Sequence, residues 1–330
     1  MSKRVGIIGC GVIAPNHLLP LKEFEETEII AVCDIKADRA NKYASEYNCK
    51  AYTDYKEMIE KENLDSVHVC LPHYLHCEVT VYALSNGVDV LCEKPMAIHY
   101  SEAIKMKEAA EKYNRKLGII FQNRYNDGAK FAKKIIRKGK LGKVTCVYAD
   151  VIWGRDQAYY DSDAWRGKWK TEGGGVLINQ AIHTLDLLRY LVDSEVVSVE
   201  SGVSHKGPTN IEVEDTAEGL IKFENGARGI FYFTNNFLGN ISPRLNVEGE
   251  KGRIEIRGAS AKVYYNDGTV EYSRTNKNAK VIGKACYGLG HFKQIEDFYS
   301  ETPKIDMLGE AIKTQKLLEE IYKSAGIERK

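Results

Sequence analysis

The stretch Val5-Gly6-Ile7-Ile8-Gly9-Cys10-Gly11-Val12-Ile13-Ala14 joins a short apolar run to the spacing G-x-G-x-x-A. It predicts a buried strand, a tight turn and the start of a helix, the context in which this spacing marks a dinucleotide-binding unit. Gly9 allows the tight turn, Gly11 lets a pyrophosphate approach the backbone, and Ala14 lets the helix pack closely. Pro15 suits the first helical turn, where a missing N–H costs nothing. The cofactor contacts predicted in this stretch are Gly9, Gly11, Val12 and Ile13.

The second predicted strand, residues 28–33, ends in Asp34. An acidic residue at roughly this distance from the glycines accepts hydrogen bonds from the adenosine ribose hydroxyls. Its charge repels a 2′-phosphate, so the sequence predicts NAD rather than NADP as the cofactor. Lys36 and Arg39 are positively charged and soften this preference. In the alternative interpretation, Asp34 only caps the helix that begins near Asp38.

Strands and helices continue to alternate after Asp34, which predicts a doubly wound parallel sheet, an α/β Rossmann domain over residues 1–122. Such sheets bind ligands at the carboxyl ends of their strands. We therefore expect further cofactor contacts after the fourth, fifth and sixth strands, from Leu71, Pro72, His73, His76, Glu93, Lys94 and Gln122. The plainer interpretation makes the two histidines a loop residue and part of a first helical turn. The predicted strands are 51–52, 66–70, 88–92 and 117–121, and the predicted helices are 38–47, 54–61, 74–86 and 101–114.

Glu93-Lys94-Pro95 follows the apolar run Val88–Cys92 directly. That run predicts a buried parallel strand, so the triplet lies at the edge of the sheet where a ligand crevice is expected. Pro95 removes a backbone donor and favours an extended Lys94, so the ammonium is aimed by a stiff backbone. In the alternative interpretation, Lys94 is a solvated charge and the Lys-Pro pair only ends the strand.

The pattern changes after residue 122 and becomes mainly strands with one embedded helix from Val144 onward. It predicts a second, α+β domain over residues 123–330, with a large, mainly antiparallel, open-faced sheet. No flexible Ser/Pro linker separates the two domains, so we expect a packed junction that forms a ligand cleft. The predicted strands are 143–153, 195–204, 214–223, 226–235, 244–250, 252–257, 261–266 and 269–273, after a helix at 127–138.

All three tryptophans of the chain fall between residues 153 and 169, interleaved with Arg, Asp and Tyr. Aromatic faces with charged donors around them suit a polyhydroxylated ring. The predicted substrate contacts are Trp153, Arg155, Tyr159 and Trp165 from this segment, with Arg124 after the sixth strand. In the alternative interpretation, the tryptophans fill a satellite core under a rigid surface loop. Tyr287 and His291 are further candidates for the pocket, with a cap and turn as the simpler interpretation.

Gly173-Gly174-Gly175 precedes an apolar stretch, Val176–Leu188, that predicts a helix. Asn179 and His183 are four residues apart, and Asp186 lies three further on, so the three side chains share one helix face. Such a polar stripe has two interpretations. One is a core histidine hydrogen-bonded to Asp186, and the other is a general acid/base in a cleft with Asn179 binding substrate beside it.

The glycine-rich turn, the Glu93-Lys94-Pro95 triplet and the helix ending near Asp186 match one family in order and spacing. The chain resembles the Gfo/Idh/MocA oxidoreductases over essentially its whole length. The resemblance implies a nicotinamide-dependent enzyme in which Lys94 and His183 are catalytic and converge on the hydroxyl being oxidised, beside substrate-binding Asn179. It also implies a cis Lys94–Pro95 bond and a homodimer or homotetramer that forms through the sheet of the second domain.

One position departs from the inositol dehydrogenase-like members, which carry an aspartate where this chain has Asn179. Asparagine cannot relay a proton, so His183 depends on another group or shares the work with Lys94. This version resembles members that act on pyranose sugars, nucleotide sugars or glycosides. We therefore expect an NAD-dependent dehydrogenase that interconverts a secondary hydroxyl and a ketone on a sugar, glycoside or cyclitol. The alternatives are an NAD-retaining glycosidase-like enzyme that uses transient oxidation, a non-catalytic NAD-binding sensor, and a structural oligomer.

Composition narrows the class of protein further. The chain has 330 residues, enough for about two domains, and a formal net charge of +1 without a long basic block, which argues against a nucleic-acid partner. Its eight cysteines include no CxxC pair, so we expect reduced thiols and no metal site. The sequence shows neither a signal peptide nor a membrane-spanning apolar stretch, which predicts a cytoplasmic protein without membrane contact.

Overall fold

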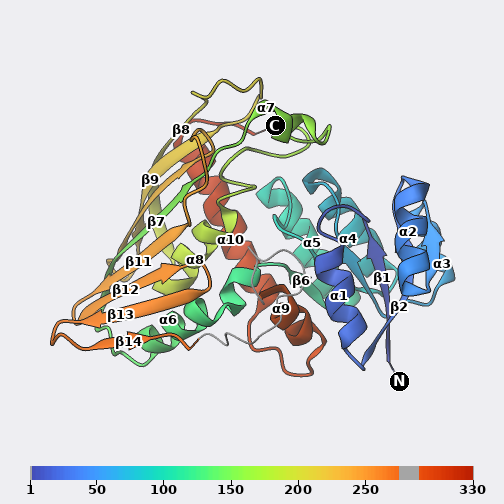
Figure 1. The fold of residues 1–330 in the computed structure, drawn as a ribbon, viewed down its shortest axis with the longest axis horizontal. Coiled ribbons are helices and arrows are strands. Elements are labelled where there is room, and N and C mark those ends of the chain that lie inside the picture. The colour runs from blue at the N-terminus through green and yellow to red at the C-terminus, as the bar shows by residue number, and fades with distance from the viewer. Residues whose placement is uncertain (1, 275–289, 330) are drawn as a thin grey trace. The chain divides into compact units, whose positions relative to one another are not determined.

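The computed structural model describes residues 2–274 and 290–329, which form two compact units (Figure 1). Residues 2–120 and 290–312 make up the first unit, and residues 121–274 and 313–329 make up the second. Tyr287 and Cys286 lie outside the described residues. None of the seven described cysteines forms a disulfide. Within the described residues, no helix is both long enough and apolar enough to cross a bilayer.

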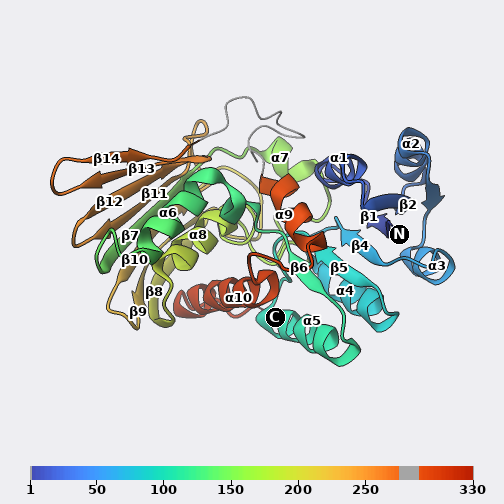
Figure 2. The same cartoon turned by 90° about the horizontal axis from the view of Figure 1, so that it is seen from below.

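The first unit is built on a six-stranded parallel sheet with the strand order β3-β2-β1-β4-β5-β6. This order confirms the predicted doubly wound Rossmann fold. Helices α1 and α9 cover one face of the sheet, and α4 and α5 cover the other (Figure 2). The strands are β1 Lys3–Ile8, β2 Thr27–Cys33, β3 Lys50–Tyr52, β4 Ser66–Val69, β5 Asp89–Cys92 and β6 Leu117–Ile119, and the helices are α1 Pro15–Glu23, α2 Ala37–Tyr47, α3 Tyr55–Lys61, α4 His76–Ser85, α5 Tyr100–Tyr113 and α9 Gly290–Tyr299.

Helix α9 comes from the far end of the chain, in the part that the sequence division at residue 122 assigned to the second domain. It packs beside α1 in the first unit. The Gln294 side chain of α9 donates a hydrogen bond to the carbonyl oxygen of Ile119 in β6, 2.7 Å away. The first unit is therefore completed by residues that follow the second sheet in sequence.

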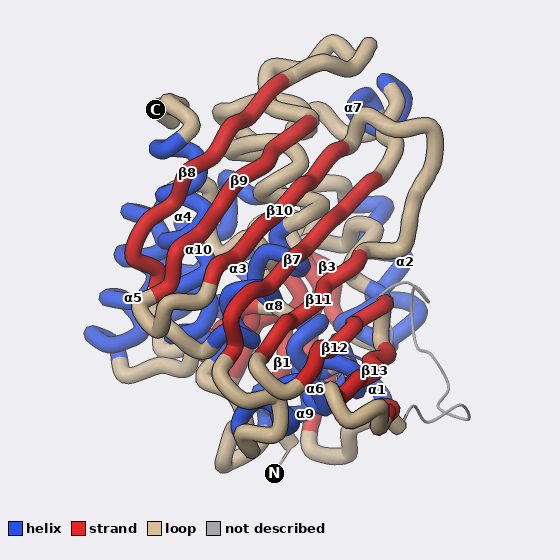
Figure 3. The backbone as a smooth tube through the Cα atoms, turned by 90° about the vertical axis from the view of Figure 1, so that its left-hand side faces the viewer, coloured by secondary structure: helices blue, strands red, loops and turns tan. Residues whose placement is uncertain are grey.

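The second unit is built on an eight-stranded sheet with the order β14-β13-β12-β11-β7-β10-β9-β8 (Figures 2 and 3). All neighbouring strands are antiparallel except β7 and β10, so the predicted mainly antiparallel sheet is confirmed. Helices α6 and α8 and the second half of α10 lie on one face, and no helix in the described part of the chain lies on the opposite face (Figure 1). The elements are β7 Val144–Ile152, β8 Val196–Ser204, β9 Thr216–Phe223, β10 Arg228–Thr234, β11 Arg244–Gly249, β12 Gly252–Arg257, β13 Ser260–Tyr265, β14 Val270–Tyr272, α6 Asp127–Arg137, α7 Gln157–Asp161, α8 Ile182–Val192 and α10 Met307–Ser324.

The predicted helix at 176–188 begins later than expected, because α8 starts at Ile182. The preceding residues form turns around the buried carboxylate of Glu214. That carboxylate accepts hydrogen bonds from the backbone N–H groups of Gly175 at 2.9 Å and Leu177 at 3.1 Å. These backbone N–H groups bond to a side chain that is distant in sequence and not to a helical carbonyl. Apolar periodicity does not reveal such bonds, so it predicted the start of the helix too early.

Candidate active site

The β1–α1 loop has the geometry that the glycine spacing predicted. Gly9 has φ +100°, and a Cβ at this position would overlap the carbonyl oxygen of Cys70. Only glycine fits such a backbone without strain. A Cβ on Gly11 would meet no atom within 4 Å, so the backbone there is open to an approaching ligand. Ala14 is fully buried and Pro15 begins α1, as expected.

Asp34 lies at the carboxyl end of β2, against this loop. Its Oδ2 accepts a hydrogen bond from the backbone N–H of Cys10 at 2.9 Å, and its Oδ1 accepts one from Lys36 at 2.8 Å. Helix α2 has Lys36 as its N-cap residue, with no side-chain capping bond, so the interpretation of Asp34 as a helix cap is wrong. A carboxylate oxygen accepts more than one hydrogen bond, so both oxygens still have capacity for ribose hydroxyls.

Lys94 follows β5 and is half-buried, and its peptide bond to Pro95 is cis, as the resemblance implied. The backbone N–H of Lys94 donates to Glu93 Oε2 at 3.2 Å. On the other side, the carbonyl oxygen of Pro95 lies 2.7 Å from Nδ1 of His76. Nε2 of the same ring lies 2.8 Å from the carbonyl oxygen of Leu71. The neutral imidazole has one N–H and donates to one of these oxygens, and the ring lies between the loop after β4 and the loop after β5.

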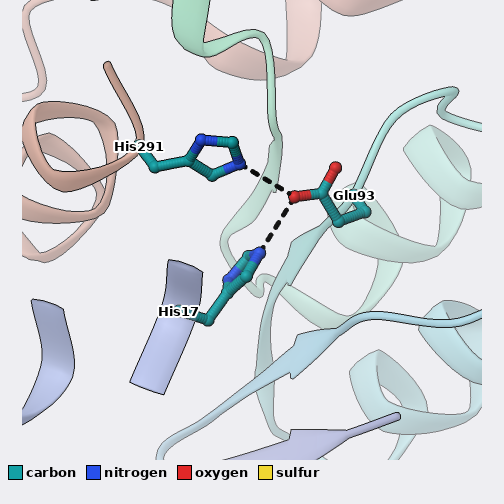
Figure 4. Close-up of side chains that lie close together, drawn as sticks. All are labelled: His17, Glu93 and His291. Atoms are coloured by element: carbon teal, nitrogen blue, oxygen red, sulfur yellow. Dashed lines mark hydrogen bonds and ion pairs between the residues drawn. The ribbon is translucent and has the colours of Figure 1, made fainter. Parts of the chain in front are cut away.

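This position corrects the expectation that His76 contacts the cofactor, because its ring is fully buried between two backbone segments. His73 is also buried, with 4% of its surface exposed. Leu71 and Pro72 are half-buried and stay predicted cofactor contacts. Glu93 is buried too, with its carboxylate directed at His17 and His291 inside the unit (Figure 4).

In the second unit, the predicted base His183 lies in the first turn of α8 and is half-buried. Its Nε2 lies 3.4 Å from the side-chain nitrogen of Gln122. The ring also meets that of Phe121 edge-on, with the centroids 6.0 Å apart. Gln122 was predicted as a cofactor contact, but the residue is only 1% exposed and its side chain lies beside His183.

Asp186 does not hydrogen-bond to His183 as one interpretation proposed. Its carboxylate accepts two hydrogen bonds from the guanidinium of Arg124, at 2.8 and 2.5 Å, and another from the hydroxyl of Thr314. Arg124 is 1% exposed. A buried, bidentate ion pair leaves this arginine a structural residue, which corrects its predicted role in substrate binding.

Asn179 lies in the turns before α8 and is held by a carboxylate that the sequence analysis missed. Its amide Nδ2 donates to Oε1 of Glu172 at 2.5 Å. The other oxygen of Glu172 accepts the backbone N–H of Gly167. Glu172 is 1% exposed, and its position directly before the three glycines was the available signal.

The hydroxyl of Tyr159 is the centre of a second group of contacts. It accepts hydrogen bonds from Arg166 at 2.5 Å and from Gln180 at 2.8 Å, and it lies 3.4 Å from Nδ2 of Asn179. Burial is the largest influence on the pKa of Tyr159 and raises it. The tyrosine therefore stays a neutral hydroxyl that links the aromatic segment to the turns before α8.

The aromatic segment folds as alternating rings and guanidinium groups around the short helix α7, which the sequence did not predict. Arg155 lies over both Trp153 and Tyr159, with its Cζ 4.9 and 5.2 Å from the ring centroids. Arg166 lies 4.6 Å over Trp165. The indole N–H of Trp153 donates to the backbone carbonyl of Ile241. These contacts order the segment and present half-buried donors and aromatic edges together.

A model of an oxidoreductase family with an NAD-binding Rossmann fold matches residues 3–121, and a model of the GFO/IDH/MocA C-terminal domain matches residues 130–255. The chain belongs to the Gfo/Idh/MocA family of oxidoreductases.

Three relatives illustrate the family. Myo-inositol 2-dehydrogenase of Thermotoga maritima is 29% identical, over 76% of this chain and 74% of its own length. D-glucoside 3-dehydrogenase of Escherichia coli is 29% identical, over 72% and 71%. The solved structure of the WlbA dehydrogenase of Chromobacterium violaceum, in complex with NADH and UDP-GlcNAcA, has a TM-score of 0.85 at 30% identity and covers 98% of this chain and 94% of its own.

The first unit of this Gfo/Idh/MocA protein fits its NAD cofactor. The open backbone at Gly11 leaves room for a pyrophosphate at the start of α1. The carboxylate of Asp34 stands beside the same loop, where ribose hydroxyls require acceptors. These two features come from different strands and meet at one edge of the sheet, as an NAD-binding Rossmann fold requires.

Proposed function

We propose that this protein is an NAD-dependent dehydrogenase that interconverts a secondary hydroxyl and a ketone on a sugar, glycoside or cyclitol. The observation that carries the proposal is the anchoring of Lys94, whose backbone is held on one side by Glu93 and on the other through Pro95 and His76. A lysine fixed in this way directly after β5 lies at the edge of the sheet that binds the nicotinamide in such folds.

Lys94 and His183 have complementary roles in this chemistry. NAD, when bound, supplies the hydride acceptor at the nicotinamide C4. The ammonium of Lys94 hydrogen-bonds the substrate oxygen and stabilises the negative charge that develops on it. Nε2 of His183 accepts the hydroxyl proton, and the substrate hydroxyl takes the place of the long 3.4 Å contact that this nitrogen makes with Gln122.

The surroundings of Asn179 support a sugar or glycoside over inositol. The Asn179 amide is committed to Glu172, so its Nδ2 orients the turn rather than moving a proton. Arg155, Tyr159 and Trp165 supply the donors and aromatic edges that suit a pyranose ring. The relatives named for glucoside and UDP-GlcNAcA fit this substrate class.

The test is NADH formation by the purified protein against matched panels of cyclitols, free sugars, glycosides and nucleotide sugars. We expect turnover with at least one sugar or glycoside, and we expect Lys94→Ala to lower kcat by about 100-fold or more while NAD affinity changes little. An active Lys94→Ala variant would refute the assignment. Release of reducing sugar without net NADH would instead support the NAD-retaining glycosidase alternative.

The open face of the eight-stranded sheet suits the assembly proposed for this chain. Ile230 and Tyr232 on β10 are each 42% exposed on that face. We propose a homodimer or homotetramer that buries this face, in a cytoplasmic enzyme. The proposal rests on the apolar side chains and on the absence of a covering helix among the described residues (Figure 3).

A further inference from the structure

Three side chains from distant parts of the chain meet inside the first unit (Figure 4). His17 comes from α1, Glu93 follows β5, and His291 comes from α9. One carboxylate oxygen of Glu93 lies 3.0 Å from Nε2 of His17 and 3.1 Å from Nε2 of His291. All three side chains are at least nine-tenths buried. We refer to these three residues as the Glu93 cluster.

The cluster carries a buried negative charge. Burial alone would raise the pKa of Glu93, but the hydrogen bonds from His17 and His291 more than offset it and hold the pKa well below the ordinary value of 4.5. Burial lowers the pKa of His17 below its ordinary 6.5, although the hydrogen bond to Glu93 opposes that change. An ionised carboxylate only accepts hydrogen bonds, so both histidines donate from Nε2.

This requirement fixes the direction of a longer chain of hydrogen bonds. A neutral His17 that donates from Nε2 must accept at Nδ1, which lies 2.9 Å from Nδ1 of His68. His68, whose pKa burial lowers well below 6.5, therefore donates from Nδ1 and accepts at Nε2. The hydroxyl of Tyr299 lies 2.9 Å from that Nε2 and must be its donor.

The chain ends at Ser66, whose hydroxyl lies 2.8 Å from that of Tyr299. Ser66 begins β4, whereas Glu93 follows the last residue of β5. The hydrogen bonds therefore run from the amino edge of the sheet to its carboxyl edge, and every donor points toward Glu93. A buried carboxylate with these donors is held in one place.

Because its carboxylate is fixed, Glu93 also holds the backbone of Lys94 in place. Its second oxygen accepts the backbone N–H of Lys94 at 3.2 Å. A glutamine here would keep the size of the side chain but would turn an amide N–H₂ toward either the Lys94 N–H or the two histidines. The first orientation opposes the amide N–H₂ to the N–H of Lys94, and the second forces the histidines to exchange their tautomers, so either one disturbs the hydrogen bonds that hold Lys94.

We propose that the Glu93 cluster positions Lys94 for catalysis and does not contact NAD. This inference rests on the proposed dehydrogenase function, and it corrects the expectation that Glu93 binds the cofactor. The cluster and the hydrogen bonds that lead to it fix the tautomers of three histidines: Nε2–H on His17 and His291, and Nδ1–H on His68.

The main test compares Glu93→Gln with Glu62→Gln. Glu62 is a buried glutamate of the same unit that binds Lys50 and Tyr52, away from Lys94. We expect Glu93→Gln to lower kcat by about 10- to 100-fold, because small misplacements of a catalytic group cost this much. The KM for NAD and the affinity for NADH should change by less than about threefold, and Glu62→Gln should keep the wild-type kcat. An unchanged kcat, or a loss of NADH affinity larger than the loss of kcat, would overturn the proposal.

A second pair of variants keeps the proposal testable if Glu93→Gln does not fold. His291→Gln retains an N–H donor of similar reach, whereas His291→Leu removes it. We expect near-normal kcat for the glutamine variant and a loss of about 10-fold or more for the leucine variant. Equal losses in both variants would indicate a packing role and would refute the positioning role.

Spectroscopy separates this inference from the proposed function. Histidine ¹⁵N NMR of the wild type should show the three tautomers given above, and hydrogen exchange at the Lys94 amide should be faster in Glu93→Gln. If no sugar is turned over, the proposed function fails, while these two measurements still test whether the Glu93 cluster holds the backbone of Lys94.

The nitrogen and oxygen atoms of His17, Glu93 and His291 that face one another lie within 4.8 Å, a spacing that also suits a metal ion. Stoichiometric zinc in the purified protein, lost in His291→Leu, would overturn the hydrogen-bond assignment.

Discussion

Asp34 holds the local backbone, and we propose that it also sets the cofactor choice. It binds the backbone N–H groups of Cys10 and Lys36 and stands beside the glycine-rich loop. We predict that Asp34→Ala weakens NAD binding by about tenfold, the loss of roughly one charge-assisted hydrogen bond, and raises the NADP-to-NAD ratio of kcat/KM. Fluorescence titration with NADH and NADPH measures the first effect, and steady-state kinetics measure the second.

The control for this prediction is Asp54→Ala. Asp54 also accepts a backbone N–H two residues further on, from Lys56 at 2.8 Å, but it caps α3 on the surface. Its replacement should leave the cofactor ratio as it is. If Asp34→Ala also leaves that ratio unchanged, the ribose contact is refuted.

At the scale of elements, the turns before α8 depend on Glu214. A Cβ on Gly175 would overlap the backbone carbonyl of Glu214, so glycine is needed for this close approach. Burial raises the pKa of Glu214 from 4.5 to about 7, although hydrogen bonds from Tyr322, Leu177 and Gly175 oppose the rise. Because the folded-state pKa lies above that of the unfolded chain, the protonated side chain stabilises the fold below about pH 4.5, and this contribution is lost as the pH rises through 7.

A shift of this size corresponds to roughly 3 kcal/mol. We predict that the free energy of unfolding of the wild type falls by about this amount, relative to Glu214→Gln, between about pH 5 and pH 8. Urea unfolding followed by tryptophan fluorescence measures it, and all three tryptophans report on the second unit. Parallel pH dependences in the two proteins would contradict the assignment.

At the scale of the whole molecule, the proposed assembly forms through the sheet face that no helix of the described residues covers. Ile230 is in register with Leu220 on β9 and with Tyr148 on β7, which places apolar side chains at the centre of that face. We predict that Tyr232→Glu converts the proposed dimer or tetramer to monomers, because a buried unpaired carboxylate is costly. Light scattering after size-exclusion chromatography gives the mass, with Tyr113→Glu at the end of α5 as the control. A monomeric wild type would refute the assembly.

The sequence by itself determined the two sheets and the glycine-rich turn. The β1–α1 loop was predictable because its requirements are local, since Gly9, Ala14 and Pro15 lie within one strand–turn–helix unit. The strands of both sheets followed from runs of apolar residues bounded by turns. His17 also had a local signal, because it lies four residues before Leu21 on the buried side of α1.

The tertiary structure alone decided which polar groups meet. Arg124 pairs with Asp186, Asn179 with Glu172, and Glu93 with His17 and His291. The cluster at Glu93 and the Arg124–Asp186 pair join residues more than 60 positions apart, so no local pattern specifies either. A buried charge takes whichever partner the fold brings within reach, because leaving it unpaired costs several kcal/mol, and that choice exists only once the distant segments have packed.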